Sequence, residues 1–179
     1  YEVAGAMGIK LATPEREVIC FVGDGSYMMA NAELATAVMR RVPFTVVLTD
    51  NRGYGCINRL QTMGCGGEPF NNMYVDCNVE VQPEIDHVAH AASMGAHAVK
   101  AKNTDQLEAE IEAARDRDIP TVIVIETIAR DFPGTGLETK AGEHGAFWDV
   151  AVPEVSDRKK QVDRYQEYLG QIAKARLVN

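Results

Sequence analysis

Short apolar runs alternate with helical patterns along the first 130 residues of the chain. The runs are rich in Val, Ile and Phe and end at Gly, Asp or Asn, as buried strands do, whereas the segments between them repeat apolar residues at helical spacing. The pattern predicts strands at 17–22, 44–49, 98–101 and 121–127. It predicts helices at 1–12, 28–41, 84–94 and 104–117, the last of them capped by Thr104.

Strands that alternate with helices and are apolar on both faces are typical of a parallel sheet covered on each side. The expected fold class is therefore α/β, a doubly wound, mainly parallel sheet with helices on both faces and right-handed crossovers. Residues 1–130 are expected to form this domain. Beyond them the sequence is richer in Gly, Pro and charge, and 131–179 are expected to be a C-terminal extension whose helix, at 157–176, docks on the domain.

Two segments depart from the regular alternation. Residues 52–83 carry many Gly, Asn and Cys and little periodicity, with one short helix expected around 57–61. Loops of that length in compact domains are usually functional. The chain also starts at Tyr1 within a helical pattern, which favours a piece of a longer protein.

Composition removes several classes of function. The 18 basic residues against 26 acidic ones give a formal net charge of −8, and no basic cluster is longer than 158–160, so neither nucleic acid nor an anionic membrane is an expected partner. No apolar run approaches the roughly 20 residues of a membrane span, and no signal-peptide pattern is present, so a cytoplasmic location is expected. The cysteines lack the spacing of a zinc site and are expected to be reduced thiols: Cys20, Cys56, Cys65 and Cys77.

Polar residues follow two predicted strands at the point where each ends. Asp24 lies between Gly23 and Gly25 after the first strand, and Asn51 follows the second. The carboxyl ends of parallel strands share the edge where ligands bind, so both side chains are expected to converge on one cation. Mg²⁺ takes oxygen ligands, usually one or two carboxylates completed by carbonyls, water and phosphates. These residues predict a Mg²⁺ site that holds a diphosphate, with the Gly53 carbonyl as a third protein ligand.

Each residue also has a simpler interpretation. An Asp-Gly hairpin is the alternative for Asp24, although the residues after it have helical spacing. Asn51 alone could be a turn residue before Gly53. The combination of both residues at successive strand ends favours the cation site.

The segments GDGSYMMANAELATA (23–37) and VVLTDNRGYG (46–55) resemble the diphosphate-binding signature of thiamine-diphosphate-dependent enzymes of the acetolactate synthase and decarboxylase group. The opening 26 residues are similar to the same group, so the resemblance covers at least 1–130. It implies a thiamine-diphosphate-binding fold with thiamine diphosphate and Mg²⁺ as cofactors. Asp24 and Asn51 would bind the metal by side chain and Gly53 by its carbonyl. The remaining cofactor-binding residues implied are Gly23, Gly25, Ser26, Tyr54 and Gly55.

The resemblance also implies what other parts of such an enzyme supply. In the family a glutamate on a pyrimidine-binding domain, from the same or a neighbouring subunit, activates the cofactor. This chain would then be the C-terminal, pyrophosphate-binding domain, with no catalytic residue of its own and no activity alone. The parent is expected to be a homo-oligomer, a dimer or tetramer. One departure is Asp50, because the family usually has Asn-Asn where this chain has Asp50 and Asn51.

Three further segments look like the trihydroxycyclohexane-1,2-dione hydrolase family of myo-inositol catabolism: DNRGYGCINRLQ, VAHAASMGAHA and GEHGAFWDVAVPEVS. This resemblance implies a hydrolase acting on C–C bonds, which opens the ring of a polyhydroxylated cyclic dione after the cofactor's thiazolium ylide attacks one carbonyl. Two alternatives stay open: another thiamine-diphosphate enzyme, such as an acetolactate synthase or a 2-oxo acid decarboxylase, and a non-catalytic Mg²⁺-binding regulatory module of flavodoxin-like topology.

Other side chains have weaker assignments. His144 could belong to a lid or lie on an exposed loop. Cys56 and Asn58 follow the cofactor loop and could approach the reacting centre. Ordinary positions on a helix or beside a strand are expected for His87, His90 and His97, and core packing for Met28, Met29 and Met39.

Overall fold

The computed structural model describes residues 1–59, 71–77 and 79–127. The chain divides into two units, each described by itself: Tyr1–Tyr54 with Val79–Ala129, and Gly55–Asn78 with Arg130–Asn179. The predicted extension at 131–179, its helix and His144 lie outside the described residues. No helix in the described ranges is long and apolar enough to cross a membrane.

A parallel sheet forms the centre of the first unit. Its strands are β1 (Ile19–Gly23), β2 (Thr45–Asp50), β3 (His97–Lys100) and β4 (Thr121–Glu126), in the order β1-β2-β4-β3. All three pairings are parallel, and the last residue of β1, Gly23, lies opposite Thr49 of β2. The four predicted strands are confirmed, and the helix α2 (Asp24–Met29), which begins directly after β1, excludes a hairpin at Asp24.

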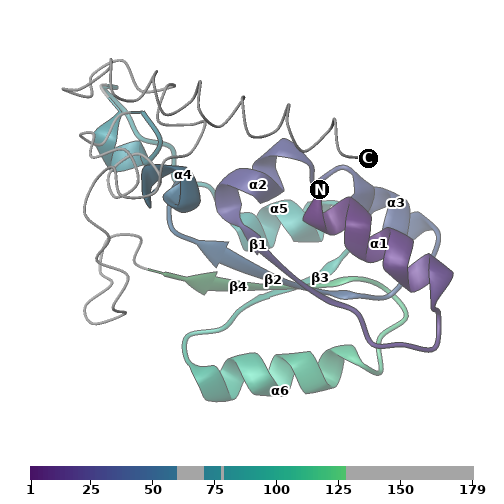
Figure 1. The fold of residues 1–179 in the computed structure, drawn as a ribbon. Helices are drawn as coiled ribbons and strands as arrows, with labels where there is room; N and C mark the ends of the chain where they lie inside the picture. Colours follow the sequence, from purple (N-terminus) through teal and green to yellow (C-terminus); the bar gives the residue numbers. More distant parts are fainter. Residues whose placement is uncertain (60–70, 78, 128–179) are drawn as a thin grey trace, which may run out of the picture. The chain divides into compact units, whose positions relative to one another are not determined.

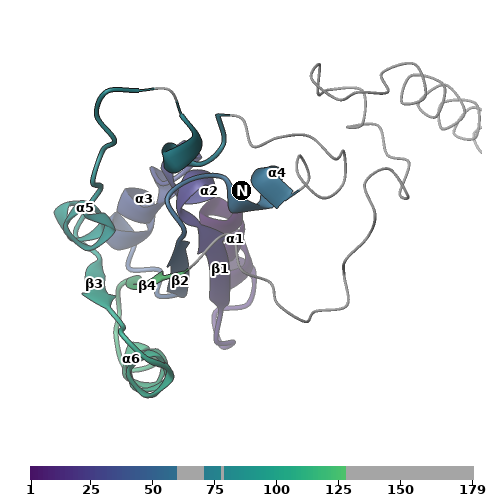
Figure 2. The same cartoon turned by 90° about the vertical axis from the view of Figure 1, so that its left-hand side faces the viewer.

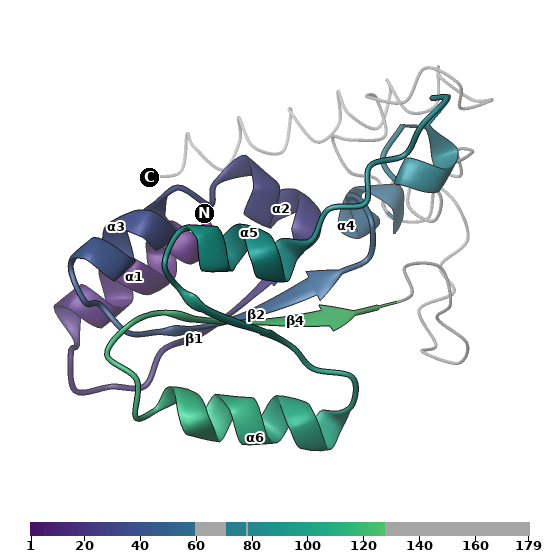
Figure 3. The same cartoon turned by 180° about the vertical axis from the view of Figure 1, so that it is seen from behind.

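Helices cover both faces of the sheet. On one face lie α1 (Glu2–Ala12), α2 (Asp24–Met29), α3 (Glu33–Met39) and α5 (His87–Ser93), and on the other lies α6 (Thr104–Ala114) (Figures 1 and 3). The step from β1 to β2 crosses the sheet in the opposite direction to the step from β3 to β4. Right-handed crossovers therefore put their helices on opposite faces. This is the doubly wound α/β class that the sequence predicts.

The helix predicted at 28–41 is wrong in its bounds, because two helices occupy this region. The α2 helix begins at Asp24, directly after the strand, and Ala30 leaves helical geometry with φ −149°. Asn31 then donates from its side chain to the Met28 carbonyl, competing with the helical backbone. The buried residues are Tyr27, Leu34 and Ala37. The methionines expected in the core are exposed instead: Met28, Met29 and Met39.

Two helices have N-terminal caps that the sequence analysis did not predict. The α6 helix is capped by Asn103, not Thr104, since the Asn103 side chain accepts a hydrogen bond from the Gln106 N–H at 2.9 Å. The α5 helix begins at His87 rather than at 84, because the Asp86 side chain accepts from the Ala89 N–H at 2.9 Å. Both caps satisfy a backbone donor that the first helical turn leaves without a partner.

The second unit contains two described elements, α4 (Gly55–Arg59) and the 3₁₀ helix η2 (Tyr74–Asp76). The α4 helix overlaps the short helix expected around 57–61. Within this unit the buried Asn58 side chain donates to Asn72 Oδ1 at 2.8 Å.

The main core of the first unit fills the space between the sheet and the helices α1, α2, α3 and α5. Val22, Val46 and Leu48 point into it from the strands and meet Tyr27 and Leu34 from the helices. The alternate residues face the other side of the sheet, where α6 lies beneath β3 and β4 and away from β1 (Figure 2). Ile19 and Phe21 of β1 are consequently exposed, Phe21 by 65%.

The cap at the start of α5 gives a first prediction. Replacing Asp86 by Ala removes the acceptor for the Ala89 N–H and should lower the free energy of unfolding by about 1 kcal/mol. Asp86→Asn keeps an oxygen acceptor and should retain most of the stability, and Asn103→Ala should cost a similar amount at α6. Urea unfolding measures all three, and an Asp86→Ala chain as stable as the parent would contradict the assigned cap.

Candidate functional site

The predicted site residues meet at the carboxyl edge of the sheet. Asp24 is the first residue of α2 and follows Gly23, the last residue of β1, while Asn51 directly follows β2. Since β1 and β2 are neighbours in the sheet, the two strand ends lie side by side. Asp24 is 2% exposed, so its carboxylate is held within the protein rather than in solvent.

Two backbone donors hold the Asp24 carboxylate. Its Oδ2 accepts from the Gly53 N–H at 2.8 Å, and its Oδ1 accepts from the Asn51 N–H at 3.3 Å. Burial raises the pKa of Asp24, these two hydrogen bonds lower it, and the neighbouring Asp50 carboxylate raises it further. The pKa of Asp24 is raised overall, so burial destabilises the charged carboxylate more than the two hydrogen bonds stabilise it. A cation at this carboxylate would offset that cost.

The side chain of Asn51 and the carbonyl of Gly53 complete a group of oxygens. The outer atom of the Asn51 amide lies 3.0 Å from the Gly53 carbonyl oxygen and 3.2 Å from Asp24 Oδ1. With its nitrogen in that place, Asn51 donates to both oxygens; with its oxygen there, three oxygens converge with no donor between them. In an octahedral ion with bonds of about 2.1 Å, neighbouring ligands lie about 3.0 Å apart. The second orientation therefore has the spacing of an oxygen-ligated Mg²⁺ site.

The backbone around Gly53 is shaped for this arrangement. Arg52 has φ +60° and Gly53 has φ +149°, a conformation that favours glycine at position 53. The turn is held by Asp50, whose Oδ1 accepts from the Arg52 N–H at 3.1 Å. The carbonyl oxygen of Gly53 lies 3.0 Å from the outer amide atom of Asn51.

Gly25 and Gly23 have different roles. A Cβ on Gly25 would lie 2.6 and 2.8 Å from ring carbons of Tyr54 and 2.9 Å from the Gly53 carbonyl oxygen, so only glycine fits. A Cβ on Gly23 would meet nothing closer than Thr49 Oγ1, at 4.0 Å. Packing of the described chain thus requires glycine at position 25, while at position 23 the backbone is open to approach by a ligand.

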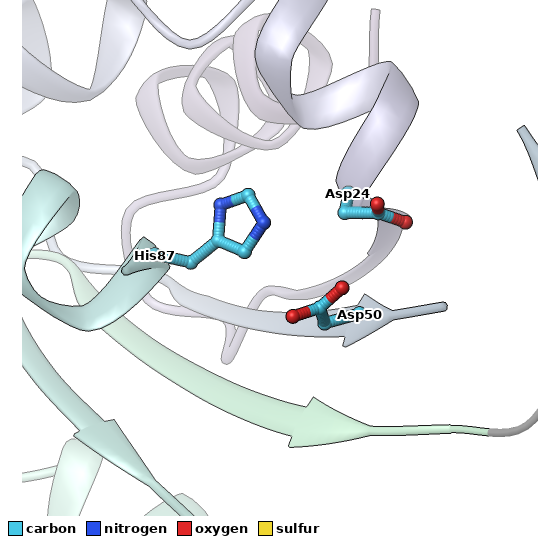
Figure 4. Close-up of side chains that lie close together, drawn as sticks. All are labelled: Asp24, Asp50 and His87. Atoms are coloured by element: carbon cyan, nitrogen blue, oxygen red, sulfur yellow. The ribbon is translucent and has the colours of Figure 1, made fainter. Parts of the chain in front are cut away.

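Two residues that the sequence analysis left out of the site lie beside it. Ligand atoms of Asp24, Asp50 and His87 all lie within 4.8 Å of one another (Figure 4). His87 is the first residue of α5, a helix position as expected, and it is buried, with 4% exposed. The sequence carried a usable signal, because helices that lead into parallel strands start at the edge where those strands end.

The other described histidines, His90 and His97, lie on α5 and at the start of β3. Nδ1 of His90 lies 3.1 Å from the hydroxyl of Tyr27, and the two rings pack edge to face. Burial raises the pKa of Tyr27 to about 12, so this hydroxyl stays protonated. Nε2 of His97 lies 3.6 Å from the Glu110 carboxylate, too far for a hydrogen bond, and is a buried atom without a hydrogen-bond partner among the described residues.

The remaining candidate residues lie in both units, Ser26 in the first and Gly55, Cys56 and Asn58 in the second. Ser26 is half-buried in α2, next to Gly25. The described cysteines, Cys20, Cys56 and Cys77, are free thiols as predicted. Burial raises the pKa of Cys20 to about 11, which leaves it without nucleophilic character at neutral pH.

Comparison with known families gives a match over most of the chain. The profile of the thiamine pyrophosphate enzyme C-terminal TPP binding domain matches residues 1–125. This range includes β1, β2 and the loop that carries Asn51 and Gly53.

Individual relatives agree with this match. The 3D-(3,5/4)-trihydroxycyclohexane-1,2-dione hydrolase 2 of Bacillus cereus is 35% identical over 182 residues, covering 98% of this chain and 27% of the relative. The 3D-(3,5/4)-trihydroxycyclohexane-1,2-dione hydrolase of Bacillus subtilis is 34% identical over 166 residues, covering 93% and 24%. The solved thiamine diphosphate-dependent 4-hydroxybenzoylformate decarboxylase of Rhodococcus jostii RHA1 superposes with a TM-score of 0.61 at 25% identity, over 71% of this chain and 23% of that one. The chain spans about a quarter of the length of these proteins.

The contrast between the two glycines gives a second prediction. Gly25→Ala forces its Cβ against Tyr54 and the Gly53 carbonyl and should destabilise the chain by about 1–3 kcal/mol. Gly23→Ala should change stability by less than about 1 kcal/mol, because its φ of −75° suits alanine and its surroundings are open. Urea unfolding of both variants measures the difference. Equal stability of the two would show that Tyr54 does not pack on Gly25.

Proposed function

This chain belongs to the thiamine pyrophosphate enzymes, of which it contains the C-terminal TPP-binding domain, and on that premise we propose that Asp24, Asn51 and Gly53 hold a Mg²⁺ ion that anchors the diphosphate of thiamine diphosphate. The single observation that supports the metal best is the position of the outer amide atom of Asn51, 3.0 Å from the Gly53 carbonyl oxygen and 3.2 Å from Asp24 Oδ1, where the amide oxygen would complete a group of three oxygens. The donor set fits Mg²⁺, because it offers one carboxylate, one amide oxygen and one carbonyl. Phosphate oxygens and water would complete six ligands.

The chain's own contribution is binding and orientation. The backbone at Gly23 is open to a ligand, and the N–H groups of Gly25 and Ser26 begin α2, where an anion is favoured by the free donors of a first helical turn. Tyr54 is fixed against Gly25 and would limit how the diphosphate enters. When bound, thiamine diphosphate supplies a thiazolium carbon that serves as nucleophile and electron sink. Gly55, which follows Tyr54 in the sequence, is also proposed to bind the cofactor.

For the whole protein we propose a hydrolase that acts on a C–C bond and opens the ring of trihydroxycyclohexane-1,2-dione in inositol degradation. The names of the curated relatives, at 34–35% identity over 93–98% of this chain, support this substrate. The activating glutamate would come from a pyrimidine-binding domain of the same or a neighbouring subunit in a dimer or tetramer. The net charge of −8 fits a small-molecule substrate better than a nucleic-acid partner, and we propose a location in the cytoplasm.

A 2-oxo acid decarboxylase is the second candidate. The observation in its favour is the superposition on the Rhodococcus decarboxylase, at a TM-score of 0.61. An acetolactate synthase would share the same anchor. A regulatory module that only binds Mg²⁺ has less support, since it gives no role to Asn51 or Gly53.

Calorimetric titration of thiamine diphosphate into this chain tests the anchor. Binding should require Mg²⁺, and Asp24→Asn or Asn51→Ala should weaken it more than tenfold, or by more than about 1.4 kcal/mol, because each removes a metal ligand. Asp118→Asn, the same chemical change at an exposed carboxylate, should leave the affinity unchanged. Mg²⁺ binding that ignores both the diphosphate and Asn51 would favour the regulatory module.

Substrate choice is tested on the full-length protein that contains this chain. With Mg²⁺ and thiamine diphosphate, trihydroxycyclohexane-1,2-dione should be converted to an open-chain carboxylic acid far faster than pyruvate or benzoylformate loses CO₂. Product analysis by mass spectrometry measures both reactions. Release of CO₂ from a 2-oxo acid without ring opening of the dione would overturn the hydrolase and support the decarboxylase.

A further inference from the structure

Asp24, Asp50 and His87 bring two carboxylates and one imidazole to a single point in the first unit. They come from three elements, the start of α2, the end of β2 and the start of α5. Figure 4 shows the imidazole directed toward both carboxylates. All three ligand atoms lie within 4.8 Å of one another. Three ligands of one ion with bonds of roughly 2.1 Å lie about 3.0–3.6 Å apart, so the side chains would have to move closer together by about 1 Å or more to bind the same ion.

The imidazole of His87 has no hydrogen-bond partner at Nδ1, although it is 96% shielded from solvent. The ring is kept in place by Tyr27, which packs edge to face on it with centroids 6.0 Å apart. Figure 4 shows Nε2 of this ring facing the two carboxylates and Nδ1 facing away from them, so an ion at the cluster would be bound through Nε2.

Charge around the cluster also favours a cation. Asp24 and Asp50 are neighbours, and Asp50 raises the pKa of the buried Asp24 further. The nearby Lys100 is paired with Glu126 rather than with either aspartate. A hollow of about 390 Å³, lined among others by Asp50, Arg52 and His87, leads to the cluster and gives an ion a path from solvent.

The geometry points to a second kind of metal site: Asp24, Asp50 and His87 bind one divalent transition-metal ion, of the Zn²⁺, Co²⁺ or Mn²⁺ class, without any diphosphate. Mg²⁺ prefers oxygen ligands only, whereas imidazole nitrogen together with carboxylates suits transition metals. This donor set differs from the proposed cofactor anchor in two of its three members. Asp24 is common to both, so an ion at His87 would compete with Mg²⁺ for that carboxylate.

Titration of Co²⁺ into this chain, without thiamine diphosphate and with Mg²⁺ in large excess, tests the site by its visible ligand-field bands. One ion per chain is expected. His87→Phe, which keeps the volume of the buried side chain, and Asp50→Asn, which keeps an acceptor for the Arg52 N–H, should each weaken binding more than tenfold. His97→Gln should leave it unchanged, although His97 also has a carboxylate within 3.6 Å.

Asn51→Ala separates this site from the proposed cofactor anchor. This variant should lose Mg²⁺-dependent binding of thiamine diphosphate and keep Co²⁺ binding, so that failure of one proposal is distinguishable from failure of the other. Unfolding in urea, measured on each variant, shows whether it is folded. Co²⁺ binding that survives His87→Phe, that is lost with Asn51→Ala, or that Mg²⁺ displaces at comparable concentration would overturn the transition-metal site.

Discussion

The Asp24 carboxylate joins two strand ends, because it accepts hydrogen bonds from the backbone N–H groups of Asn51 and Gly53. The rest of the site depends on this interaction. It sets where the Gly53 carbonyl and the Asn51 amide lie, and it brings Tyr54 against Gly25 at a distance that only glycine tolerates. The carboxylate is buried, and its raised pKa shows that two N–H groups alone do not compensate for the loss of water. The site is thus built at a cost in stability that a cation can offset.

Much of this arrangement could be predicted from the sequence, because it follows from sheet topology. Parallel strands that succeed one another with a helix between them end at the same edge, which places Asp24 near Asn51 before any coordinate is known. The role of Gly25 follows only in part: the glycine is visible in the sequence, but its reason, the ring of Tyr54, is a tertiary contact. The same limit applies to the break at Ala30 and to the cap at Asn103, where local hydrogen bonds overrode helical spacing. His87 was missed because its surroundings come from strands far away in the sequence.

Two sets of proposed metal ligands share the carboxylate of Asp24. The set with Asn51 and Gly53 offers oxygen alone, and the set with Asp50 and His87 adds a nitrogen. Asp50 also supports the turn that presents Gly53, through its bond to the Arg52 N–H. A change at position 50 therefore acts on both sets, whereas a change at His87 or Asn51 acts on one. The chemical difference between oxygen and nitrogen ligands is the basis on which the two metals would be selected.

The rotation of the Asn51 amide bears on how fast an ion would bind at the proposed Mg²⁺ site. Turning this side chain about its last torsion exchanges a donor for an acceptor while the backbone of the loop stays fixed by Asp24. In the proposed Mg²⁺ site, the empty and filled states would differ by this side-chain rotation, a motion of picoseconds to nanoseconds where the side chain is not locked by packing. Little conformational entropy would be lost on binding, since Asp24 already holds the loop. The proposed site is thus preorganised, and its occupancy would follow the free concentration of the ion without a slow refolding step.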